Sequence, residues 1–229
     1  MVQRHYQGEA GRRYQQLKRA VPERAIPWVA RLRAEKISPF IGANDVVLEY
    51  GAGFGWNLLA LSCRRKLAFD LSDFIAPSVR AAGVEFIADC ATLPDGSVEV
   101  VLCHHTLEHV PHPAAVLEEF RRLLSAKGKL LLFAPNERER RYEHYNRDNP
   151  NHHLYSWTVQ TLGCLAEESG FCVTQAGIGP FGYARLAAVW ADRLHVGERG
   201  FRSLRWLARL LRPMTEIRIV AVKDSSGIT

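Results

Sequence analysis

The chain has 229 residues, 47% hydrophobic and 24% charged, which is the composition of a globular protein with one sizeable core. It lacks the ~18 consecutive apolar residues of a membrane-spanning helix and the apolar stretch of a secretory signal, so we expect a cytoplasmic protein. Residues 1–36 and 193–223 each carry a net charge of +6, and an acidic excess in residues 37–192, together with Asp224, brings the total to +6. An acidic centre argues against a nucleic-acid partner and leaves an anionic acceptor or peripheral membrane contact open.

The predicted elements alternate between strand and helix. Residues 4–36 are expected to be helical, with breaks near Pro22 and Pro27, within an N-terminal helical cap at 1–44. The main domain, 45–229, then begins with strands at 46–50, 67–70, 84–88, 98–104 and 129–134, separated by helices at 56–63, 74–82 and 113–124. A helix at 158–169 and strands at 171–176 and 216–222 follow. This alternation predicts a doubly wound α/β sheet of about seven strands with helices on both faces.

A glycine-rich loop follows the first strand of the main domain. Gly51, Gly53 and Gly55 occupy every second position, which lets the backbone turn sharply beneath a ligand at the carboxyl end of the strand. Asp70 ends the second strand, where its carboxylate can accept hydrogen bonds from a ribose. The loop therefore predicts a nucleotide-type ligand.

Two nucleotide-binding alternatives compete for this loop. A dinucleotide fingerprint needs a third glycine where this chain has Trp56, and a phosphate-binding P-loop needs a Lys-Ser/Thr pair that is absent. Glu49, just before the loop, suits a cationic ligand better than a pyrophosphate. These residues favour S-adenosylmethionine over a nicotinamide cofactor.

The order of motifs VLEYGAGFG, AFDLSDF, FIADCATLP, VEVVLCHHTLEHV and EEFRRLLSAKGKLLLFAPN resembles the class I S-adenosylmethionine-dependent methyltransferases, close to the type 11/type 23 group. The resemblance covers about residues 45–136. It implies a Rossmann-like sheet of five parallel strands and a final pair with the last strand antiparallel. Beyond this resemblance, the polar composition and the change of pattern predict that residues 136–156 and 177–215 are a loop and helical insertions on the substrate side.

The same resemblance assigns the cofactor-binding residues. Gly51, Gly53 and Gly55 would pass beneath the methionine part, with Glu49 near its amino group, and Asp70 would hold the ribose. The complete implied set is Glu49, Gly51, Ala52, Gly53, Gly55, Asp70, Leu71, Asp89, Cys90, Ala91, His104 and His105. Ala52 stands where the family often has Cys and Phe54 where it often has Thr, and neither change removes a functional group that the implied cofactor binding needs.

Residues 105–109 also match the H-x-x-E-H motif of inverted zinc peptidases. That chemistry needs a long helix, whereas Pro111 and Pro113 leave room for about one turn. The five cysteines form no C-x-x-C pair, so a structural zinc site and a disulfide framework are not expected either. We therefore predict no metal ion.

The acceptor side is the least determined part of the sequence. An oxygen nucleophile needs a base, and the candidates are His105 and His153. Residues that would line the acceptor site are Tyr14, His109, Asn136, His153 and Tyr155. A basic amphipathic helix at 201–212 would pack over the sheet or lie at a membrane interface.

These observations predict an enzyme that transfers a methyl group in line from S-adenosylmethionine to an oxygen, nitrogen or carbon atom. The acceptor would be a small or conjugated molecule, including anionic, lipid-linked or sugar-linked ones. Two alternatives stay open: a non-catalytic S-adenosylmethionine-binding protein of the same fold, and an NAD-dependent oxidoreductase. The sequence does not indicate the oligomeric state.

Overall fold

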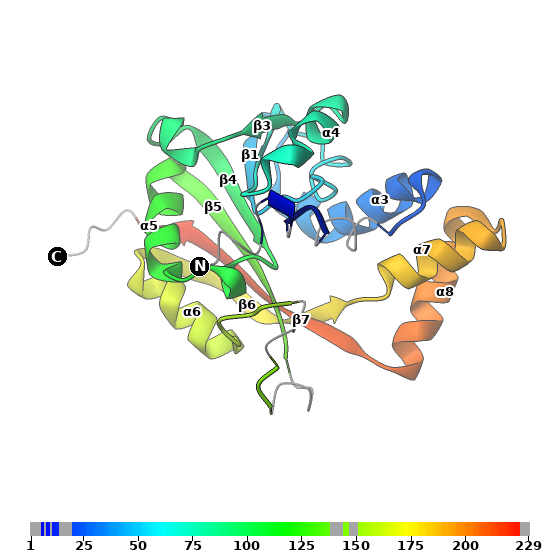
Figure 1. Ribbon diagram of the computed structural model, residues 1–229. Coiled ribbons are helices and arrows are strands. Elements are labelled where there is room, and N and C mark those ends of the chain that lie inside the picture. Colours follow the sequence, from blue (N-terminus) through cyan, green and yellow to red (C-terminus); the bar gives the residue numbers. More distant parts are fainter. Residues whose placement is uncertain are drawn as a thin grey trace.

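A computed structural model of the protein describes residues 6, 8–9, 11–13, 20–137, 144–146 and 151–224. It contains a seven-stranded sheet in the order β3-β2-β1-β4-β5-β7-β6 (Figure 1). Strands β1 (Val46–Tyr50), β2 (Arg65–Phe69), β3 (Glu85–Ile87), β4 (Val98–His104) and β5 (Leu124–Pro135) run parallel. β7 (Met214–Lys223) lies antiparallel between β5 and β6 (Phe171–Phe181). The predicted doubly wound fold is confirmed.

Helices cover both faces of the sheet because strand side chains alternate between the faces. One core joins Leu48 and Val101 to Phe120 of α5 (Pro113–Leu123) and Leu162 of α6 (Val159–Glu168). The other core joins Val47 and neighbouring strand residues to helices α3 (Ile26–Ile37) and α4 (Ala76–Ala81). Strands β1 and β4, buried on both faces, are therefore the centre of the molecule.

A third apolar cluster lies beside the sheet. Helices α7 (Ala184–Arg193) and α8 (Gly197–Leu211) follow one another between β6 and β7. Ala188 and Ala191 of α7 and Phe201 of α8 are buried against Ala25 and Val29 at the start of α3. Figure 1 shows α7 and α8 as a pair next to α3, at the opposite end of the molecule from α5 and α6.

Short 3-10 helices connect several elements. They are η1 (Glu23–Ala25), η2 (Ser38–Phe40), η3 (Asp73–Ile75), η4 (Cys90–Thr92) and η5 (Leu107–His109). In the part of the chain that the structure describes, no helix has the length and apolarity needed to cross a membrane.

Three sequence predictions differ from the structure. Residues 56–63 form successive turns instead of a helix, with the amides of Leu58 and Leu61 donating to carbonyls three residues earlier. Pro27 does not break a helix but occupies the first turn of α3, where its missing N–H costs nothing. The helical insertion is shorter than 177–215, because β6 continues to Phe181 and β7 begins at Met214.

Candidate functional site

The glycine loop leaves β1 at the carboxyl edge of the sheet. Gly51 has a φ of 77°, a conformation that L side chains rarely adopt. A Cβ at this position would lie 2.2 Å from Oγ1 of Thr106, the residue that follows His105 beyond β4. The close approach of these two segments therefore requires glycine at position 51.

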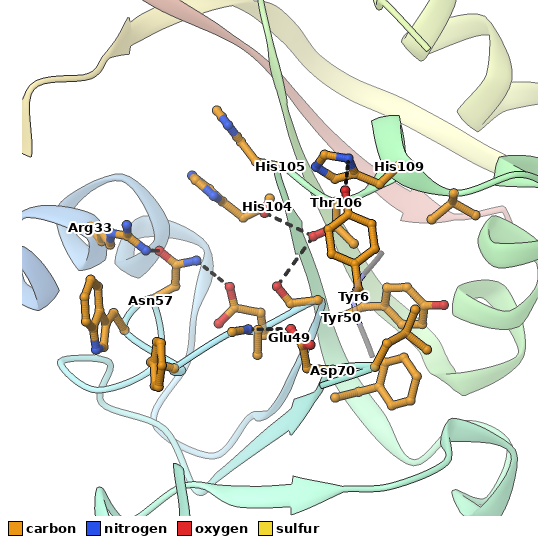
Figure 2. Close-up of a pocket in the computed structure, with 18 of the residues that line it drawn as sticks. Tyr6, Arg33, Glu49, Tyr50, Asn57, Asp70, His104, His105, Thr106 and His109 are labelled. Carbon is orange, nitrogen blue, oxygen red and sulfur yellow. Dashed lines mark hydrogen bonds between the residues drawn. The ribbon is translucent and has the colours of Figure 1, made fainter. Parts of the chain in front are cut away.

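A cavity of about 480 Å³ opens above this loop (Figure 2). Nine of the predicted site residues line it: Glu49, Gly51, Ala52, Gly53, Asp70, Leu71, His104, His105 and His109. They come from the ends of β1, β2 and β4 and the segments that follow them. The structure thus brings most of the predicted cofactor residues together at the switch point of the sheet, where ligands of such sheets bind.

Glu49 is the buried acid of this cavity. Its Oε1 accepts a hydrogen bond from the amide of Asn57, which in turn accepts one from Arg33 at 3.3 Å. Burial raises the pKa of Glu49 to about 8, despite the Asn57 hydrogen bond and the Arg33 charge. Its Oε2 is buried and has no hydrogen-bond partner among the described residues.

This orphaned oxygen tests whether the residues fit S-adenosylmethionine. A buried carboxylate oxygen without a partner is costly unless a ligand supplies a donor. The α-ammonium group of the methionine part is a donor of the right charge. Arg33, half-buried in the wall of the cavity, offers a cation to the carboxylate of the same ligand. The two residues together fit an amino-acid group.

Asp70 is the second acid that lines this cavity. Its Oδ2 accepts a hydrogen bond of 2.8 Å from the amide of Gly53, and its Oδ1 accepts one from the amide of Ser72. Burial raises the pKa of Asp70 although both hydrogen bonds oppose that shift. A carboxylate has about four acceptor sites, so the positioned Asp70 can still accept the two hydroxyls of a ribose.

Four predicted cofactor residues do not line the cavity. Gly55 continues the loop with a φ of 69°, and Asp89 caps η4 by accepting a hydrogen bond from the amide of Ala91. Cys90 is buried and Ala91 is exposed. The binding roles of these residues stay predictions. The sequence reasoning in turn missed Arg33 and Asn57, which face Glu49 from α3 and from the turn after the glycine loop.

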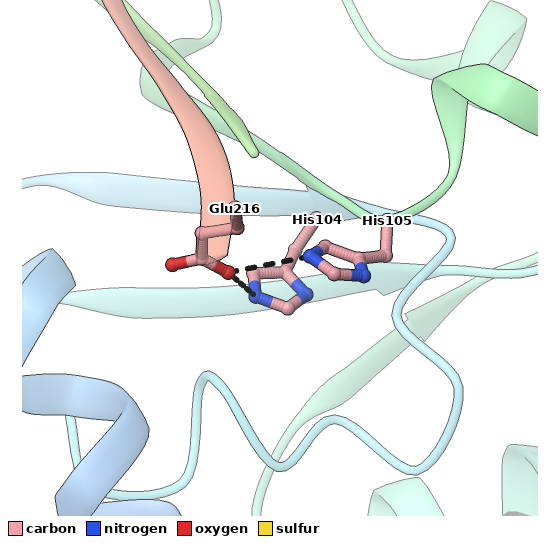
Figure 3. Close-up of side chains that lie close together, drawn as sticks. All are labelled: His104, His105 and Glu216. Atoms are coloured by element: carbon pink, nitrogen blue, oxygen red, sulfur yellow. Dashed lines mark hydrogen bonds and ion pairs between the residues drawn. The ribbon is translucent and has the colours of Figure 1, made fainter. Parts of the chain in front are cut away.

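The acceptor side of the cavity holds a pair formed by a histidine and a carboxylate (Figure 3). His105 Nε2 lies 3.2 Å from Oε2 of Glu216, which is fully buried in β7. The ring of Phe181, at the end of β6, packs 4.4 Å from that of His105. Glu216 thereby orients His105 at the wall of the cavity. Sequence reasoning missed Glu216, although a carboxylate at the start of the apolar strand IRIVAV was a signal.

Lys36 and His104 surround the same carboxylate. The Nζ of Lys36 donates to both oxygens of Glu216, at 2.7 and 2.8 Å, and to Nε2 of His104 at 2.7 Å. Burial lowers the pKa of Lys36 to about 8. Burial and the neighbouring Lys36 charge lower the pKa of His104 well below its usual value. His104 is therefore neutral near pH 7, with its proton on Nδ1.

Glu216 stays ionised within this group. Burial alone would raise its pKa, but its contacts with the His104 and His105 rings and the charge of Lys36 lower it below its usual range. Arg218 adds a further ion pair at 3.0 Å. The arrangement is a permanent buried anion with compensating cations, next to a histidine that reaches the cavity.

The remaining acceptor candidates form a second group. His153 Nδ1 lies 2.5 Å from Glu137 Oε1, and its ring contacts that of His109. His109 in turn hydrogen-bonds the hydroxyl of Tyr6 at 2.8 Å, so the N-terminal segment reaches the cavity. Asn136 donates to Thr215 and Tyr155 donates to the carbonyl of Pro111. His153, Asn136 and Tyr155 do not line the cavity. Tyr14 lies outside the described residues.

Among the residues that the structure describes, two sets of three side chains are close enough to share a cation: His104, His105 and Glu216, and Glu108, His109 and His153. In the first set the ammonium group of Lys36 already bonds two of the three members. The H-x-x-E-H segment ends in the three-residue helix η5 instead of a long helix, and His105 contacts Glu216. The peptidase geometry is therefore not formed.

Comparison with known proteins agrees with this geometry. A family model described as a methyltransferase domain matches residues 17–176. A probable S-adenosylmethionine-dependent methyltransferase of Mycolicibacterium smegmatis is 30% identical over 77% of this chain and 72% of its own length. The chain belongs to the S-adenosylmethionine-dependent methyltransferase family. The resemblance seen in the sequence is confirmed, and the nicotinamide alternative loses its support.

More distant similarities extend the comparison. A ubiquinone biosynthesis O-methyltransferase of Xanthomonas oryzae is 35% identical over 50% of this chain and 54% of its own length. The chain spans about half the length of this relative and of a probable S-adenosylmethionine-dependent methyltransferase of Mycobacterium tuberculosis that is 32% identical over 50% of this chain. A phosphoethanolamine N-methyltransferase of Haemonchus contortus has the same fold, with a TM-score of 0.60 and 14% identity over 85% of this chain and 53% of that one. These methyltransferases share the class I fold with this chain.

Proposed function

We propose that this protein transfers the methyl group of S-adenosylmethionine to an oxygen atom of a small or conjugated acceptor, with His105 as the general base. The observation that carries the proposal is the contact between His105 and the fully buried Glu216 at the wall of the cavity. Support comes also from the family and from the printed function of the Xanthomonas relative, an O-methyltransferase.

The cofactor residues position the methyl donor. Glu49 would hold the ammonium group of the methionine part, Arg33 would hold its carboxylate, and Asp70 would hold the ribose hydroxyls. S-adenosylmethionine supplies a methyl group that its sulfonium has already activated. What remains for the protein is to align the acceptor atom with that group and to exclude water.

His105 removes the proton that an acceptor hydroxyl loses. Its Nε2 donates to Glu216, so the neutral ring carries its lone pair on Nδ1. The hydroxyl proton would pass to this nitrogen as the acceptor oxygen bonds to the methyl carbon; the bond from that carbon to the sulfonium sulfur would break, with its electron pair going to sulfur and S-adenosylhomocysteine as the leaving group. Glu216 then stabilises the resulting imidazolium, and the second proton of the ring stays on Nε2. A carboxylate-supported histidine suits an oxygen acceptor, whose high pKa demands a base.

The test is methyl transfer from methyl-tritiated S-adenosylmethionine to separate panels of phenols, catechols, hydroxy acids and amines. We expect label in an oxygen acceptor, and a kcat at least about 100-fold lower for His105→Ala. His153→Ala, the other histidine candidate, is the matched control and should keep most of the activity.

Label in amines only, or full turnover by His105→Ala, would contradict the proposal. Binding of S-adenosylhomocysteine without transfer to any panel would favour the non-catalytic alternative.

A further inference from the structure

Helix α8 presents three distinct faces. Phe201 is fully buried against α3 and α7, and Leu204 packs in the same cluster. Arg202, Arg205 and Arg209 follow one another at helical spacing on a second face. The third face carries four large apolar side chains whose exposures are 63% for Trp206, 47% for Leu207, 64% for Leu210 and 79% for Leu211. The first face packs in the core of the protein, whereas the side chains of the third face are exposed to solvent.

The four exposed residues, here called the α8 apolar face, form one continuous stripe. Positions 206 and 210, and 207 and 211, are one helical turn apart, so their side chains are neighbours. Isolated exposed apolar residues are ordinary, but a contiguous group indicates an interaction surface. Trp190 of α7 and Leu194, the residue after that helix, are exposed as well, at 47% and 56%.

The charge around this face points to its partner. Residues 185–212 contain seven arginines, no lysine, and two acidic residues, Asp192 and Glu198. Both acids are already ion-paired, with Arg24 and with Arg31 and Arg202 respectively. Arg193, Arg199 and Arg212 are exposed at the surface. A partner that fits this surface therefore carries negative charges next to an apolar region.

We propose that α8 docks this protein on an anionic lipid bilayer, with the α8 apolar face in the boundary between headgroups and acyl chains. A helix with Trp and Leu on one face and arginines beside it is suited to that boundary, and arginine stems can extend to the headgroup phosphates. A second copy of this chain fits less well, because a symmetric contact would bring two strongly basic helix pairs together.

The docking helix is joined directly to the acceptor wall. The α7–α8 pair is inserted between β6, which ends at Phe181 against the ring of His105, and β7, which begins two residues before Glu216 (Figure 1). Docking through α8 would therefore hold at the lipid surface the helix pair that connects the strands carrying Phe181 and Glu216. The proposal does not depend on which atom of the acceptor is methylated.

The experiment is co-sedimentation of the full chain with vesicles. The probes are phosphatidylcholine vesicles with about 30% phosphatidylglycerol, and pure phosphatidylcholine vesicles. We expect the protein to bind the anionic vesicles. Its affinity for pure phosphatidylcholine vesicles, or for the anionic vesicles in about 0.5 M NaCl, should be at least about tenfold lower. The double variant Trp206→Ser/Leu210→Ser should bind at least about tenfold more weakly, since it removes two inserted side chains.

Ile178→Ser is the matched control, because Ile178 is a 50% exposed apolar residue on β6, away from α8. It should bind like the wild type, and far-ultraviolet circular dichroism should show all variants folded. No binding to anionic vesicles, or equal binding by the double variant and the wild type, would overturn the proposal. So would a dimer in analytical ultracentrifugation that the double variant converts to a monomer, because a second copy would then cover this face.

Discussion

The two sides of the cavity are built in different ways. The cofactor side uses residues that are neighbours in sequence: Glu49, the glycine loop and Asp70 all lie within 22 positions, at the ends of two adjacent strands. The acceptor side joins Lys36, His105 and Glu216, which come from a helix and two strand ends far apart in the chain. The cofactor site is therefore a local motif, whereas the base depends on the complete fold.

The chemistry of the two sides differs as well. Glu49 is a buried acid whose Oε2 lacks a partner among the described residues, and burial raises its pKa to about 8. Glu216 is also buried, but Lys36, His105 and Arg218 keep it ionised. The first carboxyl group is prepared to receive a cation from a ligand. The second already has its cations and acts on a neighbouring side chain.

The largest effect is expected from Glu49→Gln. An amide cannot supply the negative charge that the ammonium group of the ligand needs, and removing one member of a buried charge pair costs about 3 kcal/mol, or ~150-fold in affinity. Isothermal titration with S-adenosylhomocysteine measures this loss. An affinity within about threefold of the wild type would show that Glu49 does not bind the amino group.

A smaller effect is expected at the point where the two sides meet. Gly51→Ala places a Cβ against Thr106 and forces alanine into a left-handed conformation, which together should destabilise the fold by about 2 kcal/mol. Gly83→Ala is the matched control, because Gly83 has the same φ of 77° with nothing within 4 Å of its Cβ. Urea unfolding should show a loss of only about 1 kcal/mol there. Equal losses would contradict the contact with Thr106.

On the acceptor side, Glu216→Gln should lower kcat about tenfold, because the imidazolium of His105 loses its counter-ion. The loss of the anion also makes His105 easier to deprotonate, so the acidic limb of the pH–rate profile should move to lower pH. Steady-state kinetics across pH measure both effects. An unchanged acidic limb would indicate that Glu216 only supports the fold.

The smallest effect is the pH dependence of cofactor affinity. The folded protein without ligand keeps the Glu49 proton up to about pH 8, whereas binding of an ammonium group requires the carboxylate. Binding therefore releases a proton, and the affinity for S-adenosylhomocysteine should fall about fivefold between about pH 8 and about pH 7. Calorimetry in buffers of different ionisation enthalpy detects that proton. The affinity of Glu49→Gln for S-adenosylhomocysteine should not change over this pH range. If the affinity of the wild type did not change either, binding would not deprotonate Glu49 and the prediction would be contradicted.

The contrast between a site built from sequence neighbours and one built from distant residues explains what could be predicted from the sequence. β1 and β4 were predicted at their observed bounds because buried parallel strands are continuous apolar runs. The motif resemblance located Glu49, the glycine loop and Asp70. The helix expected at 56–63 was wrong, since in this segment Asn57 turns to bond Glu49 and Leu58 is fully buried within successive turns. No local pattern links Lys36 to Glu216, 180 positions away.

Titration of S-adenosylhomocysteine into Glu49→Gln and Glu216→Gln, side by side, tests the division between the two sides most directly. Both substitutions exchange one buried carboxylate for an amide of nearly the same shape. The account predicts that Glu49→Gln loses affinity by about two orders of magnitude, while Glu216→Gln binds within about threefold of the wild type. Equal losses in both variants, or a larger loss for Glu216→Gln, would contradict the separation of a cofactor-binding carboxyl group from one that serves the base.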